Sequence, residues 1–226
     1  MLKKILIAED DEAIRDLLDI YIDKEKYEIV FASNGEEALQ KFQMEKPDLI
    51  LLDVNMPKIS GIEVCKKIRE HHTTPIIFVT GRRDSEDVVE GLMAGADDYV
   101  IKPFDNKVLA ARIEANIRFK KIADEGDTLK IQNIELNFQK NKIQKDGREL
   151  QFHPREMNLL FYMAKNPDQV ISSRKLYEEV WEADSLGDTL TVSVHISRIR
   201  KKIEDNPKEP KLIKTVKGRG YILLKE

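Results

Sequence analysis

Residues 49–53 read Leu49-Ile50-Leu51-Leu52-Asp53, a short apolar run that ends in a carboxylate. Similar runs lie before and after it, over residues 5–8, 29–32, 76–79 and 99–101. Short apolar runs of this kind predict buried strands, and the amphipathic stretches between them predict helices over residues 12–24, 36–45, 61–70, 86–94 and 106–121. The alternation predicts an α/β domain over residues 1–121, with a doubly wound, parallel five-stranded sheet covered by helices on both faces.

The pattern changes after this domain, and the polar, glycine-containing residues 122–127 are expected to be a linker. Beyond the linker, strands are expected over residues 129–134 and 142–145, followed by a hairpin turn at Asp146-Gly147. Helical patterns then cover residues 154–165, 173–180 and 188–204, and strands over 212–216 and 221–224 form a last hairpin. Residues 128–226 are therefore expected to form a second domain of the α+β class.

The composition is that of a globular protein, with 41% hydrophobic and 35% charged residues among 226. No apolar run has membrane-spanning length, and Glu9-Asp10-Asp11 interrupts the start before a secretory signal can form. Because a single cysteine, Cys65, excludes an intramolecular disulfide, we expect a cytoplasmic protein in which Cys65 is a half-buried filler. The net charge of −3 hides a basic C-terminus, since residues 189–226 hold 10 basic and 4 acidic side chains. This asymmetry suggests different partners for the two ends.

Groups suited to phosphoryl chemistry follow the expected strands. Glu9 and Asp10 come after the first strand, Asp53 after the third, Thr80 after the fourth and Lys102 after the fifth. In a doubly wound sheet the carboxyl ends of the strands face one ligand site. An ammonium and a hydroxyl can hold the oxygens of a phosphoryl group, so Asp53 is a candidate phosphoryl acceptor.

Converging carboxylates repel one another unless a cation joins them. A Mg²⁺ ion suits the oxygens of Glu9, Asp10 and Asp53, and the backbone carbonyl of Asn55 is well placed to complete the set. The alternative for any one acid is a structural role. Asp10 or Asp11, for example, could cap the helix that begins near residue 12.

Four motifs contain these positions: Ile5-Leu6-Ile7-Ala8-Glu9-Asp10-Asp11, Leu52-Asp53-Val54-Asn55-Met56-Pro57-Lys58-Ile59-Ser60-Gly61, Val79-Thr80-Gly81 and Ala96-Asp97-Asp98-Tyr99-Val100-Ile101-Lys102-Pro103-Phe104. In this order they resemble the receiver domain of bacterial two-component response regulators, over residues 3–121. The resemblance implies a flavodoxin-like fold, phosphoryl transfer from a sensor histidine kinase to Asp53, and Mg²⁺ held by Glu9, Asp10, Asp53 and the Asn55 carbonyl. It further implies that Thr80 and Tyr99 act as switch residues, and that the Lys102-Pro103 peptide bond is cis.

Receivers of this family dimerise through ion pairs, and here the sequence departs from the pattern. Val88, Val108 and Phe119 stand where a basic residue, an acidic residue and an arginine are usual, whereas Asp98 and Arg112, the partners of another usual pair, are present. We expect a homodimer on phosphorylation in which Val88 packs against Val108, with a weaker salt dependence than an ion-paired interface. The alternative is that both valines pack within one subunit.

The helix expected over residues 188–204 combines an apolar stripe with basic side chains. Val192, Ile196, Ile199 and Ile203 recur at helical spacing and are expected to be buried. The outward positions are then left to Ser193, His195, Ser197, Arg198, Arg200 and Lys201. This arrangement is typical of a helix that reads the DNA major groove, and Lys217 and Arg219 at the hairpin tip suit phosphate or minor-groove contacts. For the helix alone, a solvated amphipathic surface is the alternative.

The second half also contains Pro154-Arg155-Glu156-Met157-Asn158-Leu159-Leu160, Asn166-Pro167, Val170-Ile171-Ser172-Ser173-Arg174-Lys175-Leu176, Val180-Trp181 and Lys214-Thr215-Val216-Lys217-Gly218-Arg219-Gly220-Tyr221. With the basic helix, these motifs resemble the winged-helix effector domain of the OmpR/PhoB subfamily, from about residue 128 to 226. The resemblance implies a recognition helix at 188–204 with Thr191 among its DNA contacts, a wing near 217–219, and a loop around 181–187 that faces RNA polymerase. Leu190 and Ser193 depart from the arginine and aspartate that are common at those positions.

We therefore expect a transcription regulator, not an enzyme, in which phosphorylation of Asp53 promotes dimerisation and binding to double-stranded promoter DNA at tandem half-sites. One alternative is a phosphohydrolase with an aspartyl-phosphate intermediate, but Asn55 stands where a second acid is needed and no general acid is available. Another is a phosphorylation-independent DNA-binding protein with an inactive receiver, against which the intact acid site argues.

Overall fold

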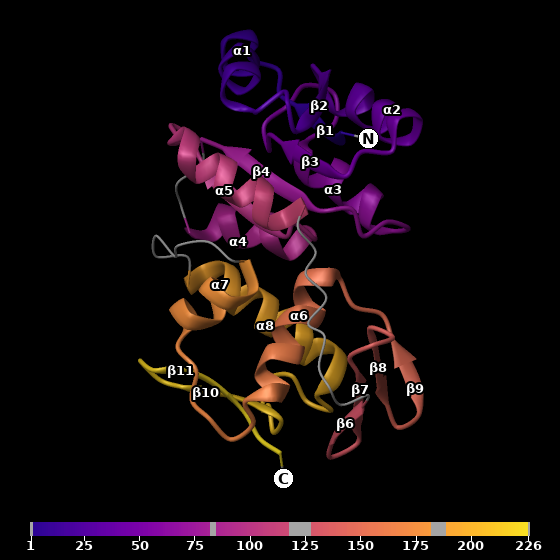
Figure 1. The fold of residues 1–226 in the computed structure, drawn as a ribbon, viewed down its shortest axis with the longest axis vertical. Coiled ribbons are helices and arrows are strands. Elements are labelled where there is room, and N and C mark those ends of the chain that lie inside the picture. Colours follow the sequence, from indigo (N-terminus) through magenta and orange to yellow (C-terminus); the bar gives the residue numbers. More distant parts are fainter. Residues whose placement is uncertain (1, 82–84, 118–127, 182–188, 226) are drawn as a thin grey trace. The chain divides into compact units, whose positions relative to one another are not determined.

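The computed structural model describes residues 2–81, 85–117, 128–181 and 189–225, and the chain divides into two compact units, Met1–Arg118 and Phe119–Glu226 (Figure 1). The division lies close to the point where the sequence pattern changes. The expected linker over residues 122–127 lies outside the described residues, as do Phe119 and the expected polymerase-facing loop after Trp181.

The first unit is the expected parallel sheet with helices on both faces. Its strands, in the spatial order β2-β1-β3-β4-β5, are β1 (Lys3–Ala8), β2 (Tyr27–Ala32), β3 (Leu49–Leu52), β4 (Ile76–Thr80) and β5 (Asp98–Ile101). Its helices are α1 (Glu12–Tyr21), α2 (Gly35–Glu45), α3 (Gly61–Arg69), α4 (Ser85–Ala94) and α5 (Asn106–Ile117). The strand order reverses between β1 and β3, and the carboxyl ends of these two strands therefore border a crevice suited to a ligand.

One core of this unit lies between the sheet and the helices α1 and α5. Alternate residues of the central strands, such as Ile5 and Ile7 of β1, pack there with Leu18 of α1 and Leu109 and Ile113 of α5. The intervening residues are also buried, and α2 contacts β1, β2 and α3. Burial of both faces explains why the strands are continuous apolar runs rather than alternating ones.

Polar caps fix where the helices begin. Asp11 is the N-cap of α1, because its Oδ1 accepts hydrogen bonds from Ala13 N at 2.9 Å and Ile14 N at 3.3 Å. The capping role left open between two acids therefore belongs to Asp11, not Asp10. Helix α1 ends at Tyr21, earlier than expected, since the side chain of Asp23 accepts a hydrogen bond from Glu25 N and starts a turn.

The second unit begins with an antiparallel sheet of β6 (Thr128–Ile131), β7 (Ile134–Asn137), β8 (Lys142–Lys145) and β9 (Arg148–Leu150). Helices α6 (Pro154–Lys165), α7 (Ser173–Trp181) and α8 (Thr189–Ile203) follow, and the hairpin of β10 (Ile213–Val216) and β11 (Gly220–Leu223) ends the fold. The turn at Asp146-Gly147 is confirmed. The single strand expected over residues 129–134 is wrong, because the chain reverses at Gln132, whose φ is +51°, and continues as β7.

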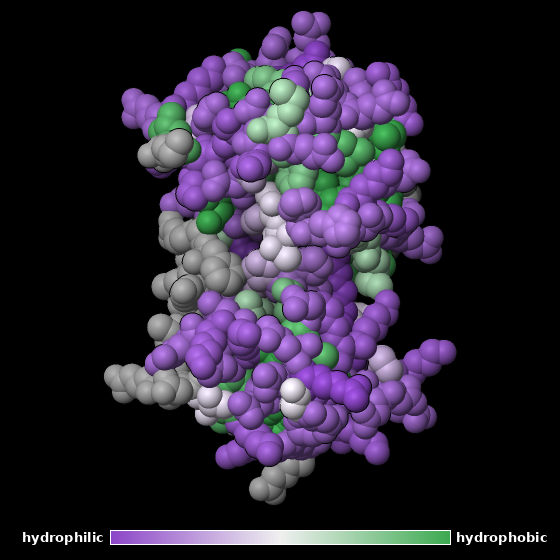
Figure 2. All heavy atoms as spheres, turned by 90° about the vertical axis from the view of Figure 1, so that its right-hand side faces the viewer, coloured by the Kyte–Doolittle hydropathy of each residue, from purple (hydrophilic) through white to green (hydrophobic). Residues whose placement is uncertain are grey.

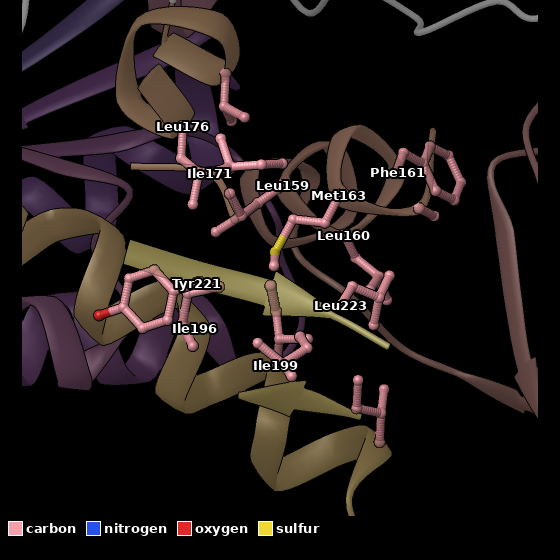
Figure 3. Close-up of a cluster of buried hydrophobic side chains, with 14 of the residues drawn as sticks. Leu159, Leu160, Phe161, Met163, Ile171, Leu176, Ile196, Ile199, Tyr221 and Leu223 are labelled. Atoms are coloured by element: carbon pink, nitrogen blue, oxygen red, sulfur yellow. The ribbon is translucent and has the colours of Figure 1, made fainter. Parts of the chain in front are cut away.

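The core of the second unit gathers side chains from α6, α7, α8 and β11. Figure 3 shows Leu159 and Met163 of α6 near Ile199 of α8, with Tyr221 and Leu223 of β11 in the same cluster. The hairpin therefore packs into the domain core by its apolar face.

Two further observations concern the surface and the single cysteine. Figure 2 shows a mainly hydrophilic face with hydrophobic atoms in patches, and no helix among the described residues is long and apolar enough to cross a membrane. Cys65 is fully buried rather than half-buried, with its Sγ 3.7 Å from the carbonyl oxygen of Ala94.

Candidate functional site

Three carboxylates meet at the carboxyl ends of β1 and β3. Oxygens of Glu9, Asp10 and Asp53 all lie within 4.8 Å of one another. The two neighbouring strands bring them together, since Asp53 N donates to the carbonyl of Ala8 at 2.8 Å and continues the parallel ladder. Glu9 and Asp53 are buried and Asp10 is exposed. The convergence predicted from the strand ends is confirmed.

Lys102 places a positive charge between two of these acids. Its Nζ lies 2.6 Å from Glu9 Oε2 and 2.7 Å from Asp53 Oδ2. Burial raises the pKa of Glu9 to about 7, although the hydrogen bond from Lys102 opposes this shift. Burial also lowers the pKa of Lys102, but its hydrogen bonds to Asp53 and Glu9 outweigh burial and the pKa is raised. The lysine is therefore charged at neutral pH, and its peptide bond to Pro103 is cis as the resemblance implied.

The other expected residues of this site lie on β4, on β5 and in the loop that follows β3. Thr80 is buried at the end of β4, and its carbonyl accepts a hydrogen bond from Lys102 N at 2.8 Å. Tyr99 is half-buried in β5, opposite Phe78. Asn55 N donates to Asp53 Oδ1 at 3.1 Å, which orients the carboxylate of the candidate acceptor.

Gly61 is a residue of this site whose structural role the sequence reasoning missed. It begins α3, and its amide donates to Val54 O at 2.9 Å. A Cβ atom at this position would lie 1.9 Å from the carbonyl oxygen of Asp53. Only glycine lets α3 start so close to the loop that follows Asp53. The signal available was a glycine directly after a serine N-cap.

Two of the expected dimer residues, Asp98 and Arg112, contact each other within the chain. Arg112 Nη1 donates to both carboxylate oxygens of Asp98, at 2.7 and 2.8 Å, and both side chains are buried. Val88 is buried and Val108 is half-buried. The pairing of Val88 with Val108 across a dimer stays a prediction.

The apolar stripe of α8 is confirmed, since Val192, Ile196, Ile199 and Ile203 are all buried. The prediction that the polar side chains face outward is wrong for His195 and Arg198, which are buried as well. Thr191, expected among the DNA contacts, is also buried. The His195 ring packs edge-on against Trp181 at 5.0 Å, and its Nδ1 lies 2.9 Å from Thr191 O. The Nη1 atom of Arg198 lies 3.9 Å from Glu156 Oε1.

Glu156 explains the inward arginine. It is buried at the first turn of α6, where its Oε2 accepts hydrogen bonds from His153 N at 3.1 Å and from Lys202 Nζ. Burial would raise the pKa of Glu156, but the Lys202 ammonium and other nearby cations outweigh burial, so the pKa is lowered. An acid placed three residues after the N-cap position, His153, was the available signal for this anchor.

The remaining polar residues form a smaller outward set than expected. Lys201, Lys217 and Arg219 are exposed, and Ser193 and Ser197 are half-buried. Arg200 is also half-buried, and its donors bind the backbone of β10. The surface available to DNA on α8 therefore carries short polar side chains and few cations.

Comparison with known proteins identifies both units. The family model of the response regulator receiver domain matches residues 5–114, and the model of the C-terminal domain of transcriptional regulatory proteins matches residues 147–223. The transcriptional regulatory protein AfsQ1 of Streptomyces coelicolor is 41% identical, over 97% of either chain. The alkaline phosphatase synthesis transcriptional regulatory protein PhoP of Bacillus subtilis is 42% identical, over 99% of this chain and 97% of its own.

Among solved structures, the chain resembles DrrB, an OmpR/PhoB homologue from Thermotoga maritima. The two are 32% identical, with a TM-score of 0.53, and the match covers 99% of this chain and all of the other.

Proposed function

The chain belongs to the OmpR/PhoB family of two-component response regulators, which are DNA-binding transcription regulators rather than enzymes, and from this we propose that a phosphoryl group on Asp53 controls its binding to promoter DNA. The observation that carries the proposal is the placement of Asp53 within 4.8 Å of two other carboxylates and 2.7 Å from the ammonium of Lys102. A receiver domain implies a histidine kinase as the phosphoryl donor.

The chemistry of the donor set fits Mg²⁺. Glu9, Asp10 and Asp53 offer hard carboxylate oxygens, and we propose that the backbone carbonyl of Asn55 completes the protein ligands. When bound, the ion would neutralise the acids and the oxygens of the incoming phosphoryl group. Lys102 would hold one phosphoryl oxygen by its ammonium, and the Thr80 hydroxyl another.

The signal then leaves the site through Thr80 and Tyr99. Thr80 is bonded through its carbonyl to the backbone of Lys102, so a shift of its hydroxyl toward a phosphoryl oxygen acts on the end of β4. Tyr99, half-buried in the adjacent β5, would turn inward into the space that Thr80 leaves. The two conformations bias the surface of α4, β5 and α5, the expected dimer interface.

A phosphorylated homodimer would bind two tandem half-sites, with one α8 and one wing at each. We propose Ser193, Ser197 and Lys201 for the groove, and Lys217 and Arg219 for phosphate or minor-groove contacts, because these side chains reach the surface. Contact with RNA polymerase and location in the cytoplasm complete the proposal, since a promoter-bound regulator works beside the polymerase.

The test is phosphorylation by a small donor. Incubation of the full chain with acetyl phosphate and Mg²⁺ is expected to add one phosphoryl group by intact mass, mapped to Asp53. Asp53→Asn should stay unmodified, and Asp23→Asn, which changes an exposed acid in the turn after α1, should label as wild type does. Labelling should also require Mg²⁺ and should raise the affinity for duplex DNA.

A chain that binds DNA equally with and without acetyl phosphate, and takes up no label, would instead be a DNA-binding protein with an inactive receiver. Hydrolysis of small phosphoesters with turnover would support the phosphohydrolase alternative.

A further inference from the structure

The connection between α8 and the wing is long. Residues 204–212 separate the end of α8 at Ile203 from the start of β10 at Ile213. A loop of this length leaves many relative placements of a helix and a hairpin open. Arg200 of α8 and Glu204, the residue directly after this helix, bridge the gap and bind the beginning of β10.

Glu204 binds the amides that lead into β10. Its Oε1 lies 3.0 Å from Leu212 N and 2.8 Å from Ile213 N, and its Oε2 lies 2.9 Å from Lys211 N and 3.1 Å from Leu212 N. The residue is buried, and a buried carboxylate is costly unless hydrogen bonds replace water. These four bonds replace it, and they fix three consecutive peptide groups to the end of α8.

Capping of α8 does not require Glu204. A carboxylate at the C-terminal end of a helix is opposed by the helix dipole, whereas a cation is favoured there. Lys145 supplies that cation, since its Nζ donates to Ile203 O at 2.7 Å. The contacts of Glu204 therefore serve the hairpin rather than the helix.

Arg200, one turn earlier on α8, binds the same strand on its carbonyl side. Its Nε and Nη2 lie 2.9 and 2.7 Å from Ile213 O, and Nη2 lies 2.9 Å from Thr215 Oγ1. The guanidinium also lies over the Tyr221 ring, 5.8 Å from its centroid. The peptide groups of Ile213 are thus held on both sides, its N–H by Glu204 and its C=O by Arg200.

The second strand of the hairpin is fixed independently. Tyr221 and Ile171 exchange two backbone hydrogen bonds, at 2.8 and 2.9 Å. Gly220 makes this possible, because a Cβ atom there would lie 2.0 Å from Ile171 O and its φ of +133° suits glycine alone. With both strands held at the base, the exposed tip at Lys217 and Arg219 projects from a fixed support.

We infer that Arg200 and Glu204 are positioning residues, which hold the wing tip at a fixed position relative to the exposed side chains of α8. Arg200 therefore contributes to DNA binding by holding the wing in place and not by touching DNA. Two contact surfaces held in the bound arrangement before association avoid the cost of ordering them on DNA. The inference rests on the proposed contact of the wing tip with DNA.

The test is a double-mutant cycle on the full chain, with a duplex selected by the wild type from a randomised pool. Arg200→Lys keeps the charge but loses the fork that spans Ile213 O and Thr215 Oγ1, and Glu204→Gln turns one acceptor into a donor facing amides. Each change is expected to lower affinity about tenfold in the wild-type background. In a chain that also carries Lys217→Ala and Arg219→Ala, each should change affinity less than about twofold, because the wing no longer contributes.

Lys208→Gln, an exposed change in the same connecting loop, is the matched control and should bind as wild type does. We call Arg200→Lys and Glu204→Gln the clamp variants. Amide hydrogen exchange over residues 213–223 of the free chain gives a second measurement, and this exchange should become faster in both clamp variants. Losses that simply add to those of the tip variant, or clamp variants with wild-type affinity and exchange, would overturn the inference. If the wild type selects no duplex, the proposed DNA-binding function is wrong. The exchange data would still test whether Arg200 and Glu204 hold the hairpin in place.

Discussion

At the residue scale, Gly61 shows how little room the backbone around Asp53 leaves for a side chain. The start of α3 lies against the carbonyl of Asp53, and a single methyl group would occupy the space of that oxygen. Gly81, after β4, is different, because among the described residues, its chain neighbours aside, a Cβ atom there would meet no atom within 4 Å. The two glycines therefore form a matched pair for substitution.

Gly61→Ala should lower the free energy of unfolding by about 1–3 kcal/mol, because the added methyl forces the loop that follows Asp53 away from α3. It should also slow labelling of Asp53 by acetyl phosphate, whereas Gly81→Ala should leave both quantities close to wild type. Urea denaturation and the time course of the intact mass measure the two effects. Equal behaviour of the two variants would contradict the steric account.

Glu37, at the start of α2, gives a dependence on pH. Its carboxylate accepts hydrogen bonds from Ser33 N and Ser33 Oγ, both at 2.7 Å, and pairs with Lys41 at 2.7 Å. The hydrogen bond with Lys41 first, and those from Ser33 next, lower the pKa of Glu37 to about 2. A pKa lowered on folding contributes stability above the ordinary value of 4.5, and this stability is lost as the pH falls toward 2.

Wild type should therefore be more stable than Glu37→Gln at neutral pH, and the difference should shrink steadily as the pH falls from 4.5 toward 2. Urea midpoints of both proteins across this range measure it. Glu36→Gln, which removes a neighbouring exposed acid, should show a difference of less than about 0.5 kcal/mol throughout. A gap between wild type and Glu37→Gln that is independent of pH would rule out the carboxylate as its cause.

The acids of the receiver were predictable and the lysine contact was not. Glu9, Asp10 and Asp53 converge because parallel strands bring their carboxyl ends to one edge, which the apolar runs already indicate. That Lys102 bridges Glu9 and Asp53 depends on the rotamers of long side chains in a folded environment. Sequence patterns hold no information on such rotamers.

At the scale of the element, α8 shows which features of a helix can be predicted from the spacing of its residues and which cannot. Its apolar stripe follows from spacing, but His195 and Arg198 are buried through partners on other elements, Trp181 and Glu156. Which side chains of a helix are buried and which are exposed thus depends on contacts across the whole domain, and not only on the helix's own sequence pattern. Similarly, the sequence predicts one strand where the structure has β6 and β7, because the turn at Gln132 contains neither glycine nor proline.

Ile199→Ala should lower the free energy of unfolding of the second unit by about 2–5 kcal/mol, since Ile199 is fully buried in the core drawn in Figure 3. Lys201→Ala, two residues further on the exposed side, should change it by less than about 0.5 kcal/mol. The lysine variant should instead weaken DNA binding and reduce its dependence on salt. Thermal or urea unfolding and binding at several salt concentrations separate the two roles.

At the scale of the whole molecule, the chain consists of two units that each have a hydrophobic core of their own. The acid cluster belongs entirely to the first unit. A ligand that binds this cluster only in the folded state therefore stabilises the first unit. Its binding shifts the unfolding equilibrium of the unit that holds the site and no other.

Calorimetry of the full chain should show Mg²⁺ raising the unfolding temperature of the first unit, by a stabilisation of about 2.7 kcal/mol at a hundredfold excess over Kd. The unfolding of the second unit should not respond. Asp10→Asn should reduce the shift without altering the fold, because Asp10 is exposed. An equal shift of both transitions, or an unchanged response of Asp10→Asn, would contradict assignment of the ion to this cluster.

The bridge that Lys102 makes between Glu9 and Asp53 also bears on how the protein matures. A cluster of acids with no internal counterion would resist burial until a metal arrived, and newly made chains would depend on the metal supply to fold. Here the lysine provides that counterion from the same chain. We therefore expect the chain to fold without bound magnesium, so that scarcity of the proposed ion would limit phosphorylation of Asp53 rather than the amount of folded protein.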